Sequence, residues 1–513
     1  MSTCATSKLT SSSSGNYRGC VTSSSSLSST STRHAHKKKK INRRLISTSR
    51  PSASPSAHAT SSGVMEGVGT IVDGSWCDEF AHLNDRLPHE PLALPQINST
   101  CRVVLVRHGQ STWNAEGRMQ GCSDISVLTE KGQGQAAKTR DMLMNVKYDA
   151  LHHSPLKRAA ETAQIVWGDG RDGSPVHVHA SLREIDLYTF QGLLKNEGVE
   201  KYPDEYALWK DTPADFAVDV GNRVHRPVVE LWYRGSLAWQ HVLEDADGGV
   251  AESRLVVAHN AINQAMICTA LGLPPRFFRK VLQSNAAASA LTFSPASEEG
   301  GQVGVSVGAI NATPGVRSLR PRSGAPAQVL LVRHVDVDSK DGYAEASRVA
   351  VLLRKCSVST VCACTSRNTL TTAGALVEEL RAKPPPIGSF VTSAETLDDL
   401  EGGESLLRTK SARLLVMENL AAPEGEAWER SSEAWAALCE EADAAPIGSS
   451  LVAFASAEVI AAIVCRALGV EDSQAPATIA SLQGDMPYGA LSCILRPKGG
   501  TEGFLRCYNT GTV

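Results

Sequence analysis

The sequence predicts an α/β fold with largely parallel sheets, present in two tandem copies of which the second is degenerate. Short apolar runs alternate with helical patterns, as they do where buried parallel strands are joined by helices. Internal repetition supplies the second observation, because matching segments recur in the same order and imply two copies of one fold. The repeats pair RVVLVRH (102–108) with QVLLVRH (328–334), ETA (161–163) with TTA (371–373), and LVVAH…ALG (255–259, 270–272) with VAFAS…ALG (452–456, 467–469).

The elements of the first copy follow from their periodicity. Residues 103–106 and 255–258 are continuous apolar runs, which predicts two fully buried strands. Leu156, Ala160, Ala163 and Trp167 fall on one face of a predicted helix, and residues 261–271 form another. Residues 193–240 carry three tryptophans among many charges and are predicted to be a helical insertion over the sheet.

Composition divides the chain into five predicted regions. Residues 1–65 hold ten Lys or Arg, twenty Ser and no Asp or Glu, which is typical of a disordered organelle transit peptide, with a nuclear address or a disordered basic arm as the alternatives. We expect the chloroplast stroma, or alternatively the mitochondrion. The predicted regions are a transit peptide (1–65), an N-terminal extension (66–98), a catalytic domain (99–296), a Gly/Pro/Arg-rich linker (297–325) and a degenerate, non-catalytic domain (326–513).

The charge of the body argues against two classes of partner. Beyond residue 65 there are 41 basic and 54 acidic residues, a net charge of −13, whereas nucleic-acid binding usually needs a basic face. No stretch approaches the roughly 20 apolar residues of a membrane helix. We therefore expect neither nucleic acid nor membrane as a partner. The scattered cysteines are expected to be reduced and mostly buried.

Two histidines stand where ligands collect in open α/β sheets, beyond the carboxyl ends of buried strands. His108 and His259 each follow such a strand directly. Arg158 is expected in the first turn of a helix, where it could hold an anion or simply be solvated. Glu184, in the segment LREID, could equally pair with Arg183 at the surface. A single one of these residues would usually be structural, so the case depends on the set.

The set resembles the signature of the histidine phosphatase (phosphoglycerate mutase-like) superfamily. The matching segments are RHGQSTWN (107–114), SPLKR with ETA (154–158, 161–163), LRE (182–184) and VAHN (257–260). They follow the family's order between residues 107 and 260. The resemblance implies the phosphoglycerate mutase-like three-layer α/β/α fold for both copies.

The resemblance also implies a mechanism and a set of site residues. Neutral His108 would attack phosphorus and form a phosphohistidine, while Glu184 would serve as general acid and then base. Positive charge from arginines and histidines would neutralise the phosphoryl oxygens, so no metal ion or other cofactor is expected. The residues implied to bind phosphate or substrate are Arg107, Asn114, Gln120, Gly121, Arg158, Lys195, His259 and Asn260.

The second copy departs from this pattern at nearly every working position. Arg333-His334 survives, but Asp336 and Asp338 follow it and would repel phosphate. The aligned repeats place Asn368 at the position of Arg158, with Arg367 one residue out of step, Ser456 at His259 and Asp399 roughly opposite Glu184. We expect this copy to be non-catalytic and to pack against the first copy, support a homo-oligomer or bind a regulator.

The predicted function is hydrolysis of a small sugar phosphate monoester. A phosphoglycerate mutase is the alternative enzyme, because FQGLLK (190–195) resembles the mutase pattern too. Mutases usually carry GESL followed by Arg after the insertion, whereas residues 229–234 read VELWYR. A scaffold protein without turnover is the third hypothesis.

Two further points remain open in the sequence. Lys195, Arg223, Arg226 and Arg234 are candidates for binding a substrate carboxylate. Cys122 follows Gln120-Gly121, so its oxidation could distort the substrate loop, although an unreactive thiol is the simpler interpretation.

Overall fold

The structure is a computed structural model that describes residues 90–168, 173–220, 223–244, 251–298, 300–315, 319–321, 323–382, 412–484 and 486–510. The chain divides into two units, Met1–Asp73 and Gly74–Val513, and every element given below belongs to the second. The predicted transit peptide and most of the predicted N-terminal extension lie outside the described residues.

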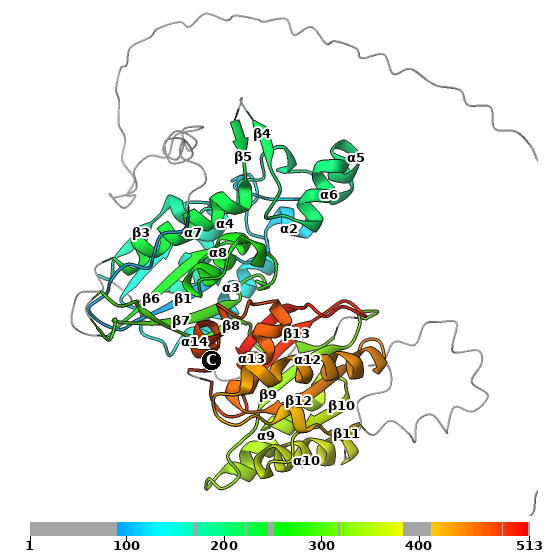
Figure 1. Cartoon of the computed structure of the whole chain (residues 1–513). Coiled ribbons are helices and arrows are strands. Elements are labelled where there is room, and N and C mark those ends of the chain that lie inside the picture. The colour runs from blue at the N-terminus through cyan, green and yellow to red at the C-terminus, as the bar shows by residue number, and fades with distance from the viewer. Residues whose placement is uncertain are drawn as a thin grey trace, which may run out of the picture. The chain divides into compact units, whose positions relative to one another are not determined.

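Twelve strands of the described residues form one mixed sheet, in the order β11-β10-β12-β9-β13-β14-β8-β7-β1-β6-β2-β3 (Figure 1). The strands of the first half are β1 (Cys101–Arg107), β2 (Ala150–His153), β3 (Val176–Val178), β6 (Glu252–Ala258), β7 (Ala288–Ser294) and β8 (Gly304–Ala312). Those of the second half are β9 (Gln328–Arg333), β10 (Val358–Ala363), β11 (Arg413–Val416), β12 (Ser450–Ala455), β13 (Leu491–Leu495) and β14 (Phe504–Thr510).

The predicted buried strands form the centre of the first half. β1 and β6 are parallel, with Val106 opposite Val257 and Arg107 opposite Ala258. β2 and β3 extend the parallel part of the sheet beyond β6. β7 and β8 pair antiparallel on the other side of β1, an arrangement that the expectation of a largely parallel sheet did not include. Because β1 and β6 end at the same edge, the residues that follow them meet there.

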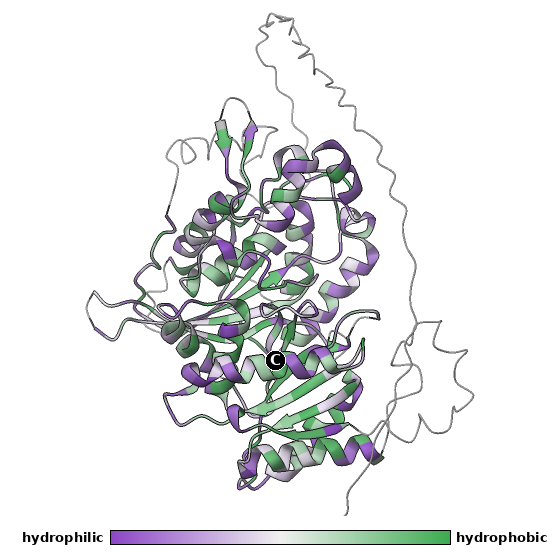
Figure 2. Ribbon diagram, turned by 45° about the vertical axis from the view of Figure 1, so that its right-hand side comes forward, coloured by the Kyte–Doolittle hydropathy of each residue, from purple (hydrophilic) through white to green (hydrophobic). Residues whose placement is uncertain are grey.

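Helices cover both faces of this half, which makes three layers. Val104 and Val106 of β1 pack with α3 and α4, whereas Val103 and Leu105 pack with α7 and α8. Alternate side chains of a strand point to opposite faces, so a continuous apolar run is what a doubly covered strand requires. Figure 2 shows hydrophobic residues concentrated in the strands. The helices are α2 (Thr112–Glu116), α3 (Glu130–Leu143), α4 (Lys157–Trp167), α7 (Pro227–Leu243) and α8 (Asn260–Ala270).

The second half repeats this strand order with elements of its own. From its outer edge to the centre of the sheet, the order of its strands is β11-β10-β12-β9-β13-β14. From the opposite edge, the order in the first half is β3-β2-β6-β1-β7-β8. The halves meet where β14 pairs antiparallel with β8, with Tyr508 opposite Ile310. The helices of this half are α9 (Gly342–Leu353), α10 (Arg367–Ala382), α12 (Ala427–Ala444), α13 (Ala457–Leu468) and α14 (Ala475–Gln483).

Three expectations need correction. The expected linker, 297–325, contains β8, whose Val307 is fully buried, because the Gly/Pro-rich segments only flank a strand. The predicted Leu156 and Ala163 are buried, but the buried face of α4 also includes Ala159, Thr162 and Val166, so it is displaced from the predicted face. Residues 193–240 include a strand pair as well as helices, and α7 within them is a core helix. These elements are α5 (Lys195–Lys201), α6 (Pro203–Asp211), β4 (Val218–Val220), β5 (Arg223–His225) and α7.

Other features agree with the sequence analysis within the described part of the chain. The ten cysteines described there are free, and all except Cys122 are buried. None of the described helices combines the length and apolar character needed to cross a membrane. The end of the predicted N-terminal extension packs on α7, where the Leu92 amide donates to Ser236 Oγ at 2.8 Å and Ile97 is buried.

A stack of histidines beside β2 predicts that the fold loses stability in acid. His152 is 3% exposed, with Nδ1 3.0 Å from His179 Nε2. Burial, then His179 and His177, lowers the pKa of His152 to about 2. Below pH 6.5 the unfolded chain therefore binds a proton at this residue that the folded chain does not bind, and stability is lost as the pH falls.

We expect His152→Leu to reduce this loss. Between about pH 6 and pH 4 the parent's free energy of unfolding should fall by about 1.4 kcal/mol per pH unit more than that of the variant. Denaturant titrations at several pH values measure the two slopes, with pH 8 as the reference at which the residue is neutral in both states. Equal slopes would show that His152 is not buried in its neutral form.

Candidate active site

His108 stands at the carboxyl end of β1 and presents one ring nitrogen as a nucleophile. The side chain is 1% exposed, and its Nδ1 lies 2.7 Å from the Gly109 carbonyl oxygen. A carbonyl oxygen only accepts hydrogen bonds, so Nδ1 carries the proton. The lone pair of the neutral ring is therefore on Nε2.

The surroundings keep this imidazole unprotonated. Burial, followed by the charges of Arg107 and Arg158, lowers the pKa of His108 well below its usual value. The ring is thus neutral at physiological pH, as attack on phosphorus requires.

Arg107 is held at the same strand end. Its Nη1 donates to the Gln283 carbonyl at 2.7 Å, and its backbone amide donates to the Ala287 carbonyl at 3.1 Å. Burial lowers the pKa of Arg107 to about 10, which leaves the guanidinium charged at neutral pH. Its Nε is buried and has no hydrogen-bond partner among the described residues.

Arg158 lies in the first turn of α4, as the sequence predicts, and is fully buried. Its Nη1 donates to the Ser123 carbonyl at 2.5 Å and its Nη2 to the Gly121 carbonyl at 2.9 Å. These bonds fix the loop that carries Gln120 and Gly121, where Gly121 has a φ of +52°. Burial lowers the pKa of Arg158 to about 10, so it too stays charged.

His259 directly follows β6 and is the N-cap residue of α8. Its ring centroid is 5.1 Å from that of His108, and Nε2 lies 2.7 Å from Ser154 Oγ. Burial and then Arg158 lower the pKa of His259 well below its usual value. Its Nδ1 is buried and has no hydrogen-bond partner within the part of the chain that the structure describes.

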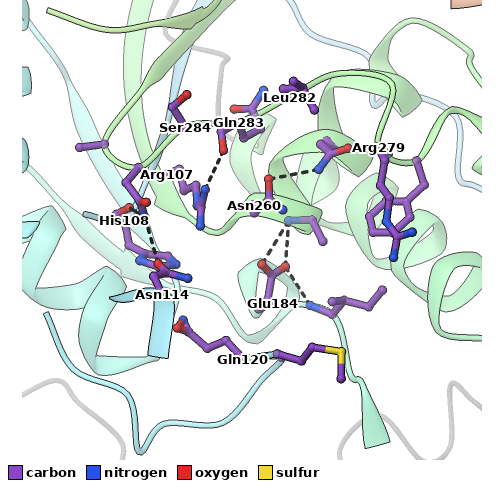
Figure 3. Close-up of a pocket in the computed structure, with 18 of the residues that line it drawn as sticks. Arg107, His108, Asn114, Gln120, Glu184, Asn260, Arg279, Leu282, Gln283 and Ser284 are labelled. Carbon is purple, nitrogen blue, oxygen red and sulfur yellow. Dashed lines mark hydrogen bonds between the residues drawn. The ribbon is translucent and has the colours of Figure 1, made fainter. Parts of the chain in front are cut away.

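Glu184 is held against the N-terminus of α8 rather than paired with Arg183. Its Oε1 accepts from the Ile185 and Ala261 amides, both at 3.0 Å, and Oε2 accepts from Ala261 at 3.2 Å (Figure 3). Amides in the first turn of a helix have no partner within the helix and are free to bind a side-chain oxygen. Arg234 Nη2 donates to the Glu184 carbonyl at 2.8 Å, so both the backbone and the side chain of this residue are fixed.

Two amides complete the predicted set near His108. Asn114, in α2, accepts from Asn285 Nδ2 at 3.0 Å through Oδ1. Gln120 Oε1 accepts from Ser111 Oγ at 2.6 Å. Both amides therefore have their oxygen engaged.

A cavity of about 1280 Å³ brings most of these residues together (Figure 3). Arg158 and His259 are not among its lining residues. Both are buried; the charge of Arg158 lowers the pKa of His108, and the His259 ring lies beside that of His108. The predicted site residues that line the cavity are Arg107, His108, Asn114, Gln120, Gly121, Glu184, Lys195 and Asn260.

The candidates for binding a substrate carboxylate differ in whether they line the cavity. Lys195 is exposed and lines the cavity, whereas Arg226 and Arg234 are not among the lining residues. The side chain of Arg223 lies outside the described part of the chain. Sequence reasoning missed four other cations of the lining, which no motif marks: Arg118, Lys138, Lys210 and Arg279.

Cys122 has the character of an unreactive thiol. Its Sγ donates to Gln191 Oε1 at 3.3 Å. Burial and then Asp186 raise the pKa of Cys122 to about 12. The thiolate that oxidation chemistry needs is therefore scarce at neutral pH.

At the corresponding edge of the second half, the Arg-His pair after the strand is kept, but the residues that surround it differ from those of the first half. His334 Nδ1 lies 3.2 Å from the Val335 carbonyl, and Arg333 Nη1 donates to the Met486 carbonyl. Ser456 is the N-cap residue of α13, and Arg367 is paired with Asp338 at 2.7 Å.

The expected counterpart of Glu184 needs correction. Asp399 lies outside the described residues, and β11 and the 3₁₀ turn Glu418–Leu420 follow only after it. Glu184 comes two residues after the 3₁₀ turn Ala180–Leu182, and the residue at that distance after Leu420 is Ala422. The position therefore carries no acid.

Comparisons with known proteins agree with this geometry. The sequence model of the Histidine phosphatase superfamily (branch 1) matches residues 103–302. A protein of Arabidopsis thaliana named "Probable 2-carboxy-D-arabinitol-1-phosphatase" is 36% identical over 67% of this chain and 74% of its own length. The 2-carboxy-D-arabinitol-1-phosphatase of Triticum aestivum is 36% identical over 83% of this chain and 88% of its own. A glucosyl-3-phosphoglycerate phosphatase of Mycolicibacterium vanbaalenii is 33% identical over 34% of this chain and 75% of its own.

Proposed function

This chain belongs to the histidine phosphatase superfamily, and from that premise we propose that it hydrolyses a sugar phosphate monoester through a phosphohistidine at His108. The observation that carries the proposal is the environment of His108. A neutral imidazole with its lone pair on Nε2 lies close to the charges of Arg107 and Arg158 and lines the same cavity as Glu184.

The first step forms a bond between His108 Nε2 and phosphorus and breaks the bond from phosphorus to the ester oxygen. Glu184, protonated, gives its proton to the departing sugar oxygen. Arg107 and Arg158 neutralise the charge that gathers on the phosphoryl oxygens in the transition state, with His259 beside them. Because these side chains supply the positive charge, the proposed reaction needs no metal ion.

The second step releases phosphate. Glu184, now ionised, takes a proton from a water molecule as that water attacks the phosphohistidine. The bond from Nε2 to phosphorus breaks, inorganic phosphate leaves, and His108 returns to its neutral form. The tether of Glu184 to the α8 amides keeps the carboxyl group in place for both steps.

The substrate we propose is 2-carboxy-D-arabinitol 1-phosphate, an inhibitor of Rubisco, so that hydrolysis would relieve the inhibition. Two relatives named for this activity support the proposal, one of them aligned over 83% of the chain. The cavity also offers cations beyond the phosphate site, Lys195 and Arg279 among them, that could meet a carboxylate. We also propose the chloroplast stroma as the place where the protein acts, in keeping with this substrate. The acid-free, Ser-rich leader supports an organelle as the destination.

We also propose that residues 326–513 are a degenerate histidine phosphatase-like domain. Its strand order, its retained Arg333-His334 and its carbonyl contacts support this view. Asn368, Ala422 and Ser456 in place of an arginine, an acid and a histidine argue against turnover there.

A substrate panel with residues 66–513 tests the proposed function. We expect inorganic phosphate to be released, with the highest kcat/KM for 2-carboxy-D-arabinitol 1-phosphate among sugar phosphates with and without a carboxylate. Isomerisation of 3-phosphoglycerate without net phosphate release would instead identify a mutase. A chain that turns over none of these substrates would favour the scaffold hypothesis.

A further inference from the structure

We propose that the second half of the chain positions Arg107 and His108 of the first half, through a loop at residues 280–286 that both halves hold. The inference rests on the proposed function, because it takes Arg107 as a ligand of the phosphoryl group. It assigns the catalytically degenerate half a positioning role in the reaction of the other half.

One side of the loop holds the active site. The Gln283 carbonyl accepts from Arg107 Nη1 at 2.7 Å. Asn285 Nδ2 donates to the His108 carbonyl at 3.3 Å, and the Ala286 amide donates to the same carbonyl at 3.2 Å. A shift of this loop would therefore move the arginine and the nucleophile together.

The other side of the loop is bonded to the second half. The Leu282 amide donates to the Leu505 carbonyl at 2.9 Å, and the Leu505 amide donates to the Lys280 carbonyl at 2.7 Å. Lys280 Nζ also forms an ion pair with Glu502 at 2.5 Å. Phe504, next to Leu505, lines the substrate cavity with Leu495, so this half also forms part of its wall.

Asn311 links the loop to β14 from within the sheet. Its Nδ2 donates to the Arg506 carbonyl at 2.5 Å, while its Oδ1 accepts from the Ser284 amide at 2.6 Å. The side chain is 4% exposed, and the residue has a φ of +55°, which asparagine tolerates better than most residues. One buried amide thus joins the second half to the residue that follows Gln283.

The related position in the second half supplies a natural control. Asn509 has a φ of +49°, is 1% exposed, and donates through Nδ2 to the Gly308 carbonyl at 2.6 Å. Asn311 and Asn509 donate their backbone amides to Ser289 and Ser492. Ser284 lies four residues before β7, and four residues before β13 stands Pro487, which has no amide hydrogen to donate. Pro487 therefore cannot form with Asn509 the bond that the Ser284 amide forms with Asn311.

The test compares Asn311→Gly with Asn509→Gly in residues 66–513. Glycine keeps the positive φ and removes one buried amide at either site. Binding of inorganic phosphate, followed by calorimetry, should weaken by about 10- to 100-fold in Asn311→Gly, since small displacements of a binding group are costly. Asn509→Gly should bind phosphate like the parent, with a comparable loss of thermal stability.

The pH profile gives a readout that a purely structural role would not change. Arg107 lowers the pKa of His108, so its displacement should raise that pKa and move the acid limb of kcat/KM to higher pH in Asn311→Gly alone. Equal changes in both variants, or none in either, would overturn the inference and leave the halves merely stabilising one another. A parent enzyme that neither binds phosphate nor hydrolyses the panel would overturn the proposed function, and the inference with it.

A second pair of variants covers the case in which Asn311→Gly does not fold. Two exposed acids of the second half form ion pairs with the first: Glu502 with Lys280 of the loop, and Glu471 with Arg276 outside it, at 2.9 Å. Glu502→Gln should weaken phosphate binding by about two- to fivefold, because exposed pairs contribute little. Glu471→Gln should not change it. The same affinity in both variants would contradict the inference.

Discussion

The His108→Ala enzyme is expected to lose phosphatase activity by roughly four to six orders of magnitude, as enzymes do when a covalent nucleophile is removed. The loss should appear in kcat, because the phosphohistidine cannot form. Phosphate should still bind, since Arg107 and Arg158 are fixed by carbonyls of Gln283, Gly121 and Ser123 rather than by the imidazole. Steady-state kinetics and a phosphate-binding titration separate these two effects.

His334→Ala is the matched control for this variant. His334 follows a buried strand and an arginine, and its Nδ1 lies beside the next carbonyl, as in His108. Without partners equivalent to Arg158, Glu184 and His259, it should contribute nothing to turnover. Activity of His334→Ala within about twofold of the parent is the expected result. Substantial activity in His108→Ala would contradict the proposed mechanism.

Glu184→Gln is expected to reduce hydrolysis of a sugar phosphate by about 10²- to 10⁴-fold, the usual contribution of a general acid. Glutamine is close in shape and its oxygen can still accept from the α8 amides, so the site should keep its geometry. It cannot, however, protonate a sugar alkoxide or take a proton from water.

The choice of leaving group makes this prediction specific. p-Nitrophenolate leaves without protonation, so the first step with p-nitrophenyl phosphate should be largely preserved in Glu184→Gln. The second step still needs a base, and the phosphoenzyme should accumulate after a burst of p-nitrophenolate. Equal losses in the first step for both substrates would show that Glu184 is not the acid.

The sheet was predictable where burial is encoded locally. Val103–Val106 and Leu255–Ala258 are apolar on both faces, and both are central strands covered by helices. β8 was missed because its segment is rich in glycine and small residues, and its burial comes from pairing with β7 and β14. The pairing with β14 joins residues about 200 positions apart, Ile310 and Tyr508, which no local pattern encodes.

In the candidate site too, the residues marked by a motif were predictable, whereas the long-range contacts between them were not. Motif positions gave the residues that line the cavity around His108. Several of them stand at a strand end or a helix start: Arg107 and His108 at the end of β1, Lys195 at the start of α5 and Asn260 at the start of α8. The tether of Glu184 to Ala261 and the hold of Gln283 on Arg107 are long-range contacts without a motif. Arg279 likewise reaches the cavity only through the tertiary fold.

The second half illustrates the limit of aligning by chain position. Asp399 was placed opposite Glu184 by counting from the repeats, but β11 begins only at Arg413. The residue that follows the corresponding 3₁₀ turn is Ala422. The loss of the acid was thus visible only once the strands were placed.

Trapping the covalent intermediate tests the central claim most directly. Glu184→Gln, mixed with p-nitrophenyl phosphate, quenched rapidly at alkaline pH and digested, should yield one phosphorylated peptide, the one that contains His108. The modification should be absent in the double variant Glu184→Gln/His108→Ala. It should be retained in the double variant Glu184→Gln/His334→Ala. A phosphoryl group on another residue, or none during active turnover, would contradict the account.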